Sequence, residues 1–219
     1  MHGDGGGPAA GDVLAARWRL DAKIGSGSFG SVWAAVDVGS EARVAVKLLH
    51  AAHAQNTKVL GRFVQEARIQ AQLSHPAVVP VLDWRTEPVP FLVMPLVEGE
   101  SLHDRCHALA EAGRGVPLAG VTWLVEQMTG AVAAAHDAGV VHRDLKPKNV
   151  LVNRRRQRPF VRVLDFGVAK ILEGGRLPAT TVGRVMGSVL YLAPEQVTGG
   201  EAPTVAVDQF ALASIAFEL

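Results

Sequence analysis

The stretch VVHRDLKPKNVLV, residues 140–152, decides how the rest of the chain is interpreted. It sets His, Arg, Asp, Pro, Asn and two Lys between short runs that are rich in β-branched residues. Polar residues this dense between strand formers predict a loop held out by two strands. The pattern alone leaves open whether this loop is a catalytic centre or a charged turn.

The length and composition favour a folded protein with one large domain or two lobes. The chain has 219 residues, of which 48% are hydrophobic, so a substantial core can form. With 22 Lys and Arg against 21 Asp and Glu, the net charge of +1 argues against nucleic acid as the main partner. The single cysteine, Cys106, fits a reducing compartment, and no stretch approaches the ~18 apolar residues of a membrane span.

The first half of the chain has the patterns of several strands and one helix. Residues 17–48 alternate turn-rich and β-branched segments, which predicts three antiparallel strands. Apolar residues then recur at helical spacing over 57–73, and two further strands are expected at 77–84 and 91–97. Residues 17–95 are therefore predicted to form a β-rich lobe.

The second half is predicted to be mainly helical. The expected segments are a helix over 118–138 that ends at Gly139, short strands at 150–152 and 161–164, an irregular stretch over 168–192, and a buried helix that begins near AVDQFALASIAFEL. A β-rich half followed by a helical half predicts an α+β protein of two lobes with a cleft between them. The second lobe is expected over 96–219, and residues 1–16 are expected to be a flexible Gly-rich leader.

The segment IGSGSFGSV, residues 24–32, has Gly25, Gly27 and Gly30 in the spacing G-x-G-x-x-G. Glycines allow backbone N–H groups to approach phosphates closely. A strand rather than a helix is predicted to follow, which favours a glycine-rich hairpin over a dinucleotide-binding Rossmann turn. A plain glycine turn remains the alternative.

Two further segments carry charged residues at the ends of apolar strands. VAVK ends at Lys47, whose ammonium group needs an anionic partner if it is buried. Glu66 on the predicted helix can supply that partner. The alternative is that Lys47 is a surface lysine at the end of a strand. VLDFGVA places Asp165 after a buried strand. The oxygens of Asp165 and Asn149 are the hard ligands that suit magnesium.

Five segments, taken in order, resemble those of the eukaryotic-like (Hanks-type) serine/threonine protein kinases of bacteria: GSGSFGSV, VAVK, HRDLKPKN, DFG and APE. The resemblance covers about residues 17–219. Lys146, two positions after Asp144, matches the serine/threonine group rather than the tyrosine group. The resemblance implies a two-lobed protein kinase fold and transfer of the γ-phosphate of ATP to protein Ser or Thr hydroxyls with Mg²⁺.

The resemblance also implies roles for individual residues. Asp144 would accept the proton of the substrate hydroxyl, Lys146 would steady the γ-phosphate, and Asn149 would ligate Mg²⁺ together with Asp165. The residues expected around ATP are Ile24, Gly25, Gly27, Gly30, Val32, Ala45, Lys47, Glu66, Met94, Val97, Leu151 and Asp165. His142 is expected to anchor the loop by packing and hydrogen bonding rather than to act as a base.

A regulatory arrangement is implied by Arg143, which directly precedes Asp144. Similar kinases use this arginine to bind a phosphate on the activation segment. Thr180 and Thr181 in PATTVGR are the candidate phosphosites, with self-phosphorylation in trans as the expected route. Plain solvent-facing loop threonines are the alternative.

The last segment, AVDQFALASIAFEL, resembles the start of the central helix of the large lobe, with Asp208 bracing the catalytic loop. The C-terminal lobe is therefore expected to be incomplete, with an apolar surface exposed on this helix. A truncated, inactive nucleotide-binding or interaction module is the alternative function. A small-molecule kinase is disfavoured because HRDLKPKN occurs together with APE. The expected location is cytoplasmic, alone or as part of a membrane-anchored kinase.

Overall fold

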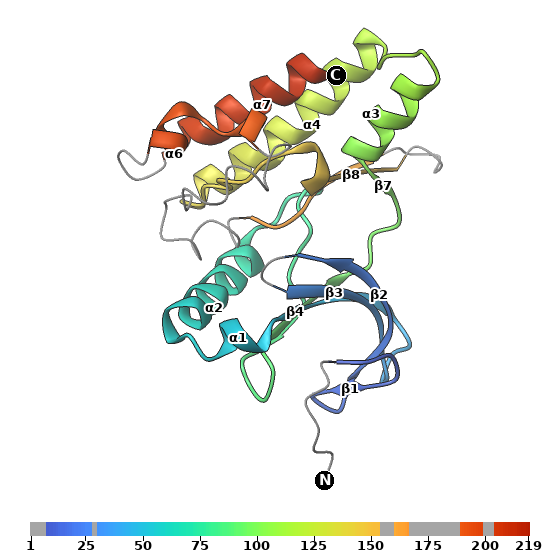
Figure 1. The fold of residues 1–219 in the computed structure, drawn as a ribbon, viewed down its shortest axis with the longest axis vertical. Helices are drawn as coiled ribbons and strands as arrows, with labels where there is room; N and C mark the ends of the chain where they lie inside the picture. Colours follow the sequence, from blue (N-terminus) through green and yellow to red (C-terminus); the bar gives the residue numbers. More distant parts are fainter. Residues whose placement is uncertain (1–7, 28–29, 154–159, 167–188, 199–203) are drawn as a thin grey trace. The chain divides into compact units, whose positions relative to one another are not determined.

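The computed structural model describes residues 8–27, 30–153, 160–166, 189–198 and 204–219, apart from the side chains of Arg62, Glu66 and Val189. These residues form two compact units (Figure 1). One unit consists of Met1–Ala67 and Pro80–Val97, and the other of Arg68–Val79 and Glu98–Leu219. The chain therefore passes between the units more than once, and the lobe boundary expected between residues 95 and 96 stays a prediction.

The elements follow one another as strands and helices with short connections. They are β1 (Val13–Leu14), β2 (Trp18–Ser26), β3 (Gly30–Asp37), β4 (Arg43–Leu49), α1 (Ala51–Ala54), α2 (Thr57–Gln72), β5 (Asp83–Arg85), β6 (Phe91–Pro95), β7 (Glu100–Ser101), α3 (Leu102–Glu111), α4 (Leu118–Asp137), the 3₁₀ helix η1 (Pro147–Asn149), β8 (Val150–Asn153), β9 (Phe160–Val163), the 3₁₀ helix η3 (Val189–Tyr191), α6 (Pro194–Thr198) and α7 (Ala206–Glu218).

The first unit contains a six-stranded antiparallel sheet in the order β1-β2-β3-β4-β6-β5. The three strands predicted over 17–48 are confirmed as β2, β3 and β4, and α2 confirms the predicted helix over 57–73. One face of the sheet buries a cluster that includes Trp18, Leu20, Trp33, Val46 and Phe91. Alternation along each strand accordingly directs the intervening residues to the opposite face.

The strand predicted at 77–84 is wrong in extent. Only Asp83–Arg85 forms a strand of the six-stranded sheet, whereas Val78 makes an isolated parallel bridge with Val163 in the second unit, to which both residues belong. Pro80 lies between the two pieces. Because proline has no N–H to donate to a ladder, it interrupts a strand at this point.

The leader predicted to be flexible over 1–16 is also wrong in its second part. Val13–Leu14 forms β1 against β2, and the Gly11 N–H donates to the Leu20 carbonyl at 2.7 Å. The Leu20 N–H in turn donates to the Asp12 carbonyl at 2.8 Å. Leu14 packs against the buried cluster of the sheet, which supplies the apolar contact that a Gly-rich composition does not suggest.

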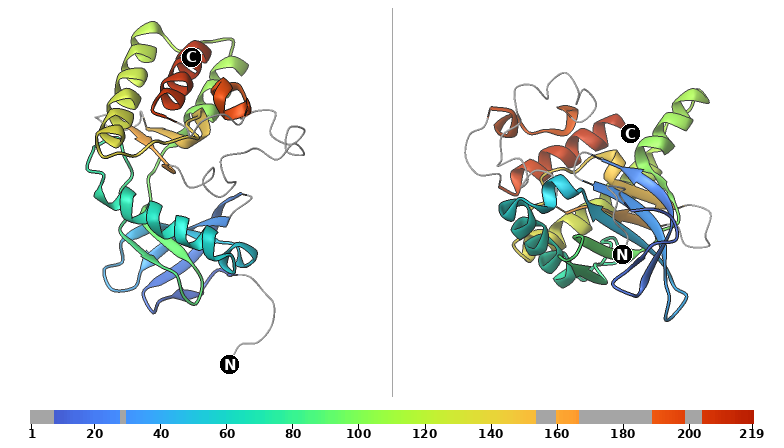
Figure 2. Two further views of the ribbon diagram at one scale, coloured as in Figure 1. Left: turned by 90° about the vertical axis from the view of Figure 1, so that its left-hand side faces the viewer. Right: turned by 60° about the horizontal axis from the view of Figure 1, so that its bottom comes forward.

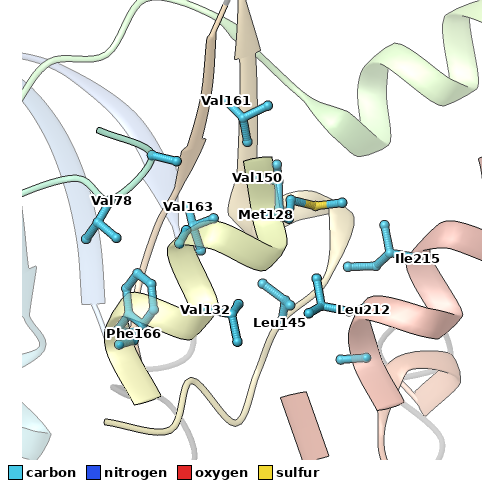
Figure 3. Close-up of a cluster of buried hydrophobic side chains, with 14 of the residues drawn as sticks. Val78, Met128, Val132, Leu145, Val150, Val161, Val163, Phe166, Leu212 and Ile215 are labelled. Carbon is cyan, nitrogen blue, oxygen red and sulfur yellow. The ribbon is translucent and has the colours of Figure 1, made fainter. Parts of the chain in front are cut away.

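The second unit is built around α4, which lies beside α7 (Figures 1 and 2). The three-stranded sheet β7-β8-β9 packs its buried face on the same core, so that residues from both helices and both longer strands meet. Figure 3 shows this cluster, including Met128, Val132, Leu145, Val163 and Ile215. The predicted short strands near 150–152 and 161–164 are confirmed as β8 and β9.

The helix predicted over 118–138 is confirmed as α4, which ends one residue before Ala138. Gly139 follows with φ +75°, a left-handed conformation in which glycine carries no Cβ penalty. The Val140 N–H then donates back to the Ala135 carbonyl at 2.8 Å, which closes the end of the helix. The turn delivers the chain directly into the stretch at 140–152.

Helix α7 has two different apolar faces. Val207, Ala211 and Ile215 are buried against the core, whereas Phe210 is 39% exposed and Phe217 is 96% exposed. The expectation that this helix presents apolar surface to solvent is confirmed. Within the described residues, none of the helices combines the length and the hydropathy that crossing a membrane requires.

Gly30 permits a close approach of β3 to β4. A Cβ placed on Gly30 would lie 2.0 Å from the Leu48 carbonyl oxygen, whereas a Cβ on Gly27 would meet no atom within 4 Å. The glycine at position 30 is therefore required by strand packing in addition to any role toward a phosphate.

We expect Gly30→Ala to lower the free energy of unfolding by about 2 kcal/mol, because the strands must separate to admit the methyl group. Gly27→Ala is the matched control and should change it by less than about 0.5 kcal/mol. Urea unfolding of both variants measures the difference. Equal effects of the two substitutions would contradict the steric explanation.

Candidate active site

The loop that follows Gly139 is held by the carboxylate of Asp208 on α7. This side chain is fully buried and accepts hydrogen bonds from three donors. The His142 N–H donates to Oδ2 at 2.7 Å and the Arg143 N–H donates to Oδ1 at 2.8 Å. His136 Nε2 on α4 lies 2.8 Å from Oδ2. The prediction that Asp208 braces this loop is confirmed, and His136 is a partner that the sequence did not reveal.

Arg143 takes a left-handed backbone conformation with φ +66°. For a residue with a side chain this conformation costs roughly 1–2 kcal/mol, so surrounding contacts must maintain it. Asp208 holds its N–H, and Gln196 Nε2 on α6 donates to its carbonyl oxygen at 3.0 Å. Both peptide groups that flank the Arg143 Cα are thus fixed by side chains from other elements.

His142 connects the loop to the segment that contains Asp165. Its ring is fully buried, and Nε2 lies 2.9 Å from the Leu164 carbonyl oxygen. The Asp144 N–H donates to the His142 carbonyl at 2.9 Å and also lies 3.3 Å from Nδ1. An N–H group facing Nδ1 and a carbonyl facing Nε2 fit a neutral imidazole that donates through Nε2. Burial lowers the pKa of His142, which favours the same neutral form. The prediction that His142 is an anchor is confirmed.

The three residues predicted to be catalytic lie together. Lys146 Nζ donates to Asp144 Oδ2 at 2.6 Å, and both side chains are largely buried. Asn149 Nδ2 donates to the Asp144 main-chain carbonyl at 2.8 Å and reaches Oδ2 at 3.4 Å. The Asp144 carboxylate thus lies beside the Lys146 ammonium group, and Asn149 fixes the main chain of Asp144.

Asn149 and the Asp165 segment are joined through the main chain. The Leu164 N–H donates to the Asn149 carbonyl at 2.8 Å, directly before Asp165. Asp165 has φ +54°, an unusual conformation for a residue other than glycine. Because Asn149 Nδ2 is used by Asp144, its amide oxygen is the atom that suits a cation. A carboxylate and an amide oxygen on adjacent segments fit a magnesium ion that also binds phosphates.

In the first unit, strand register gathers four of the predicted nucleotide residues on one face of the sheet. Val32 is the cross-strand partner of Lys47, and Ala45 is the partner of Met94. All four alternate with members of the buried cluster, such as Val46, and so belong to the opposite face. A lysine therefore stands among aliphatic side chains, which suits a ligand with an apolar ring and an anionic group.

The glycine-rich turn joins β2 and β3 next to this face. The Gly27 N–H donates to the Gly30 carbonyl at 2.9 Å, and Gly25 pairs with Val32 across the hairpin. The predicted glycine-rich hairpin is confirmed. His50 Nε2 lies 3.1 Å from the Gly27 carbonyl oxygen, a contact between residues 23 positions apart that no local pattern could have indicated.

The remaining predicted site residues lie in both units or outside the described structure. Ile24 is 53% exposed on β2, Val97 is the last residue of the first unit, and Leu151 on β8 pairs with Ser101 and Arg162. The side chain of Glu66, like Thr180 and Thr181, lies outside the described residues. A nucleotide pocket made by residues of both units stays a prediction.

Residues 18–219 match the family model described as the protein kinase domain. The chain is 38% identical over 217 residues to the serine/threonine-protein kinase PknA of Mycobacterium tuberculosis H37Rv, covering 96% of this chain and 48% of that protein. It is also 38% identical over 211 residues to the serine/threonine-protein kinase Pkn1 of Myxococcus xanthus, covering 94% of this chain and 29% of the relative. The chain thus spans half the length or less of these curated relatives.

The fold is similar to that of solved structures. The crystal structure of the Mycobacterium tuberculosis PknI kinase domain matches with a TM-score of 0.72 at 27% identity, and the match covers 97% of this chain and 77% of that domain. A protein kinase fold, as predicted from the motifs, is therefore confirmed by independent comparisons of sequence and structure.

Replacement of Asp208 by Asn should lower the free energy of unfolding by roughly 2–4 kcal/mol, because one amide oxygen cannot accept from all three buried donors. Asp137→Asn, at an exposed carboxylate at the end of α4, is the matched control and should have little effect. Chemical denaturation measures both. A loss no larger than that of the control would contradict the assigned role of Asp208.

Proposed function

The chain belongs to the protein kinase domain family, and on that premise we propose that it transfers the γ-phosphate of ATP to Ser and Thr hydroxyls of proteins. The observation that carries the proposal is the contact of Lys146 with the Asp144 carboxylate, on a loop braced by Asp208. Lys146 stands where serine/threonine kinases have a lysine, and the curated relatives are named serine/threonine-protein kinases. We further propose a cytoplasmic location, which the single cysteine supports.

Asp144 is proposed to be the base that receives the proton of the substrate hydroxyl. In the described part of the chain, the side-chain hydrogen bonds from Lys146 and Asn149 to this carboxylate both go to Oδ2. Oδ1 is then the oxygen that can accept from an incoming hydroxyl. Lys146 holds the carboxylate in place and brings a positive charge to the point where the γ-phosphate must be transferred.

Asn149 and Asp165 are proposed to hold magnesium, and Lys47 to contact the phosphates. A divalent cation bound there supplies charge neutralisation for the phosphates of ATP. On the first unit, Val32, Ala45 and the backbone of the glycine-rich hairpin support binding of an apolar ring with an attached phosphate chain. Phosphoryl transfer depends mainly on positioning and on charge, which these groups are suited to supply.

The activity itself can be tested with labelled ATP, magnesium and a generic protein substrate. We expect the wild-type chain to incorporate label into Ser and Thr, and Asp144→Asn and Lys47→Met to lose about 100-fold or more of the rate. Asp137→Asn and Lys58→Met, at exposed positions, are the matched controls and should retain activity. ATP binding without label incorporation by the wild type would instead favour the inactive binding module.

Arg143 is proposed to respond to phosphorylation of Thr180 or Thr181. Among the residues that the structure describes, its buried Nε has no hydrogen-bond partner. A guanidinium can bind a phosphate through two parallel hydrogen bonds, and Nε is one donor of Arg143 for which the described residues supply no acceptor. Such a bond to a phosphothreonine would hold the segment that carries it.

We expect incubation with ATP to phosphorylate Thr180 or Thr181, and a tagged Asp144→Asn copy to be modified by the wild type if the reaction occurs in trans. Mass spectrometry identifies the sites. Arg143→Ala should remove the increase in rate that accompanies phosphorylation while leaving the rate of the unmodified chain within a few-fold. A fully active sample with both threonines unmodified would reject this regulatory role.

A further inference from the structure

We infer that Gln196 is a positioning residue for Asp144, an inference that rests on the proposed kinase activity. Gln196 lies on α6, directly after the Ala-Pro-Glu motif, and is only 8% exposed. Its Nε2 donates to the Arg143 carbonyl oxygen at 3.0 Å. That carbonyl belongs to the peptide group that joins Arg143 to Asp144, so Gln196 fixes the main chain at the residue proposed to be the base.

The other half of the Gln196 amide has a separate purpose. Its Oε1 accepts from the Ala193 N–H at 3.1 Å, while the Gln196 N–H donates to the Ala193 carbonyl at 2.9 Å. The side-chain bond is one half of a capping box, in which a residue in the first turn satisfies the free N–H at the start of the helix; the reciprocal half is absent because Ala193 has no side-chain acceptor. The two bonds also fix the orientation of the amide, because Nε2 faces an acceptor and Oε1 faces a donor.

Arg143 is the point at which positioning is needed. Its left-handed conformation is unfavourable for a residue with a side chain, and Asp208 holds only the N–H side. The Asp144 N–H of the same peptide group donates to the His142 carbonyl at 2.9 Å, a bond within the loop itself. Without the bond from Gln196, only this local bond would oppose rotation of the Arg143–Asp144 peptide group toward a commoner conformation. Such a rotation would move the Asp144 carboxylate away from the place that Lys146 and Asn149 define. An error of about 1 Å in such a group can lower the rate about 100-fold.

Gln196→Glu separates the two functions of this side chain. A glutamate keeps an oxygen for the Ala193 N–H, so the helix cap survives, but an ionised carboxylate has no proton to donate to the Arg143 carbonyl. We expect kcat to fall about tenfold or more at pH 8 with the KM for ATP unchanged. At lower pH the protonated acid can donate again, so the ratio of the variant's kcat to that of the wild type should rise as pH falls.

Gln65→Glu, an exposed substitution of the same chemistry on α2, is the matched control and should show neither effect. A variant kcat equal to that of the wild type, or a ratio that does not change with pH, would overturn the inference. If the wild type itself has no activity, the proposed function fails first and the following measurement decides the inference alone.

The nitrogen chemical shift of the Asp144 amide reports the hydrogen bond at the preceding carbonyl and requires no activity. In Gln196→Glu this resonance should move at pH 8 and return toward its wild-type position as the glutamate is protonated. In Gln65→Glu it should stay at the wild-type position throughout. An unmoved Asp144 resonance in Gln196→Glu would show that Gln196 only caps α6.

Discussion

A single buried carboxylate, that of Asp208, sets the conformation on which the proposed active site depends. A charge removed from water is stable only when donors surround it, and here two of the three donors are main-chain N–H groups of one loop. The main-chain N–H groups of His142 and Arg143 must therefore both point toward the Asp208 carboxylate. The left-handed conformation of Arg143 is consistent with this requirement.

Much of the fold could be predicted because its signals are local. The alternation that produced β2, β3 and β4, the helical spacing of α2, and the end of α4 at Gly139 all depend on residues close in sequence. The errors occurred where distant partners decide the structure. Val13–Leu14 forms a strand because it pairs with β2 and because Leu14 packs against the buried cluster of the sheet. Pro80 divides a β-rich segment into two pieces that belong to different units.

The same distinction explains which site residues were found. Asp144, Lys146 and Asn149 stand within six positions, so one motif contains them all and the structure needs only a short loop to bring them together. Gln196 and His136 act instead through hydrogen bonds that span 53 and 72 positions. A glutamine or histidine on a helix has no local signature of such a partner. Only the folded arrangement of α4, α6 and α7 around the loop reveals them.

The backbone of Arg143 has a consequence for engineering. Glycine at this position would relieve the unfavourable conformation, and asparagine would relieve part of it, so either substitution is a candidate for raising thermal resistance. The same change deletes the guanidinium that is proposed to bind a phosphate on Thr180 or Thr181. If Arg143 has this regulatory role, selection for thermal stability and selection for regulation by phosphorylation would favour different residues at position 143.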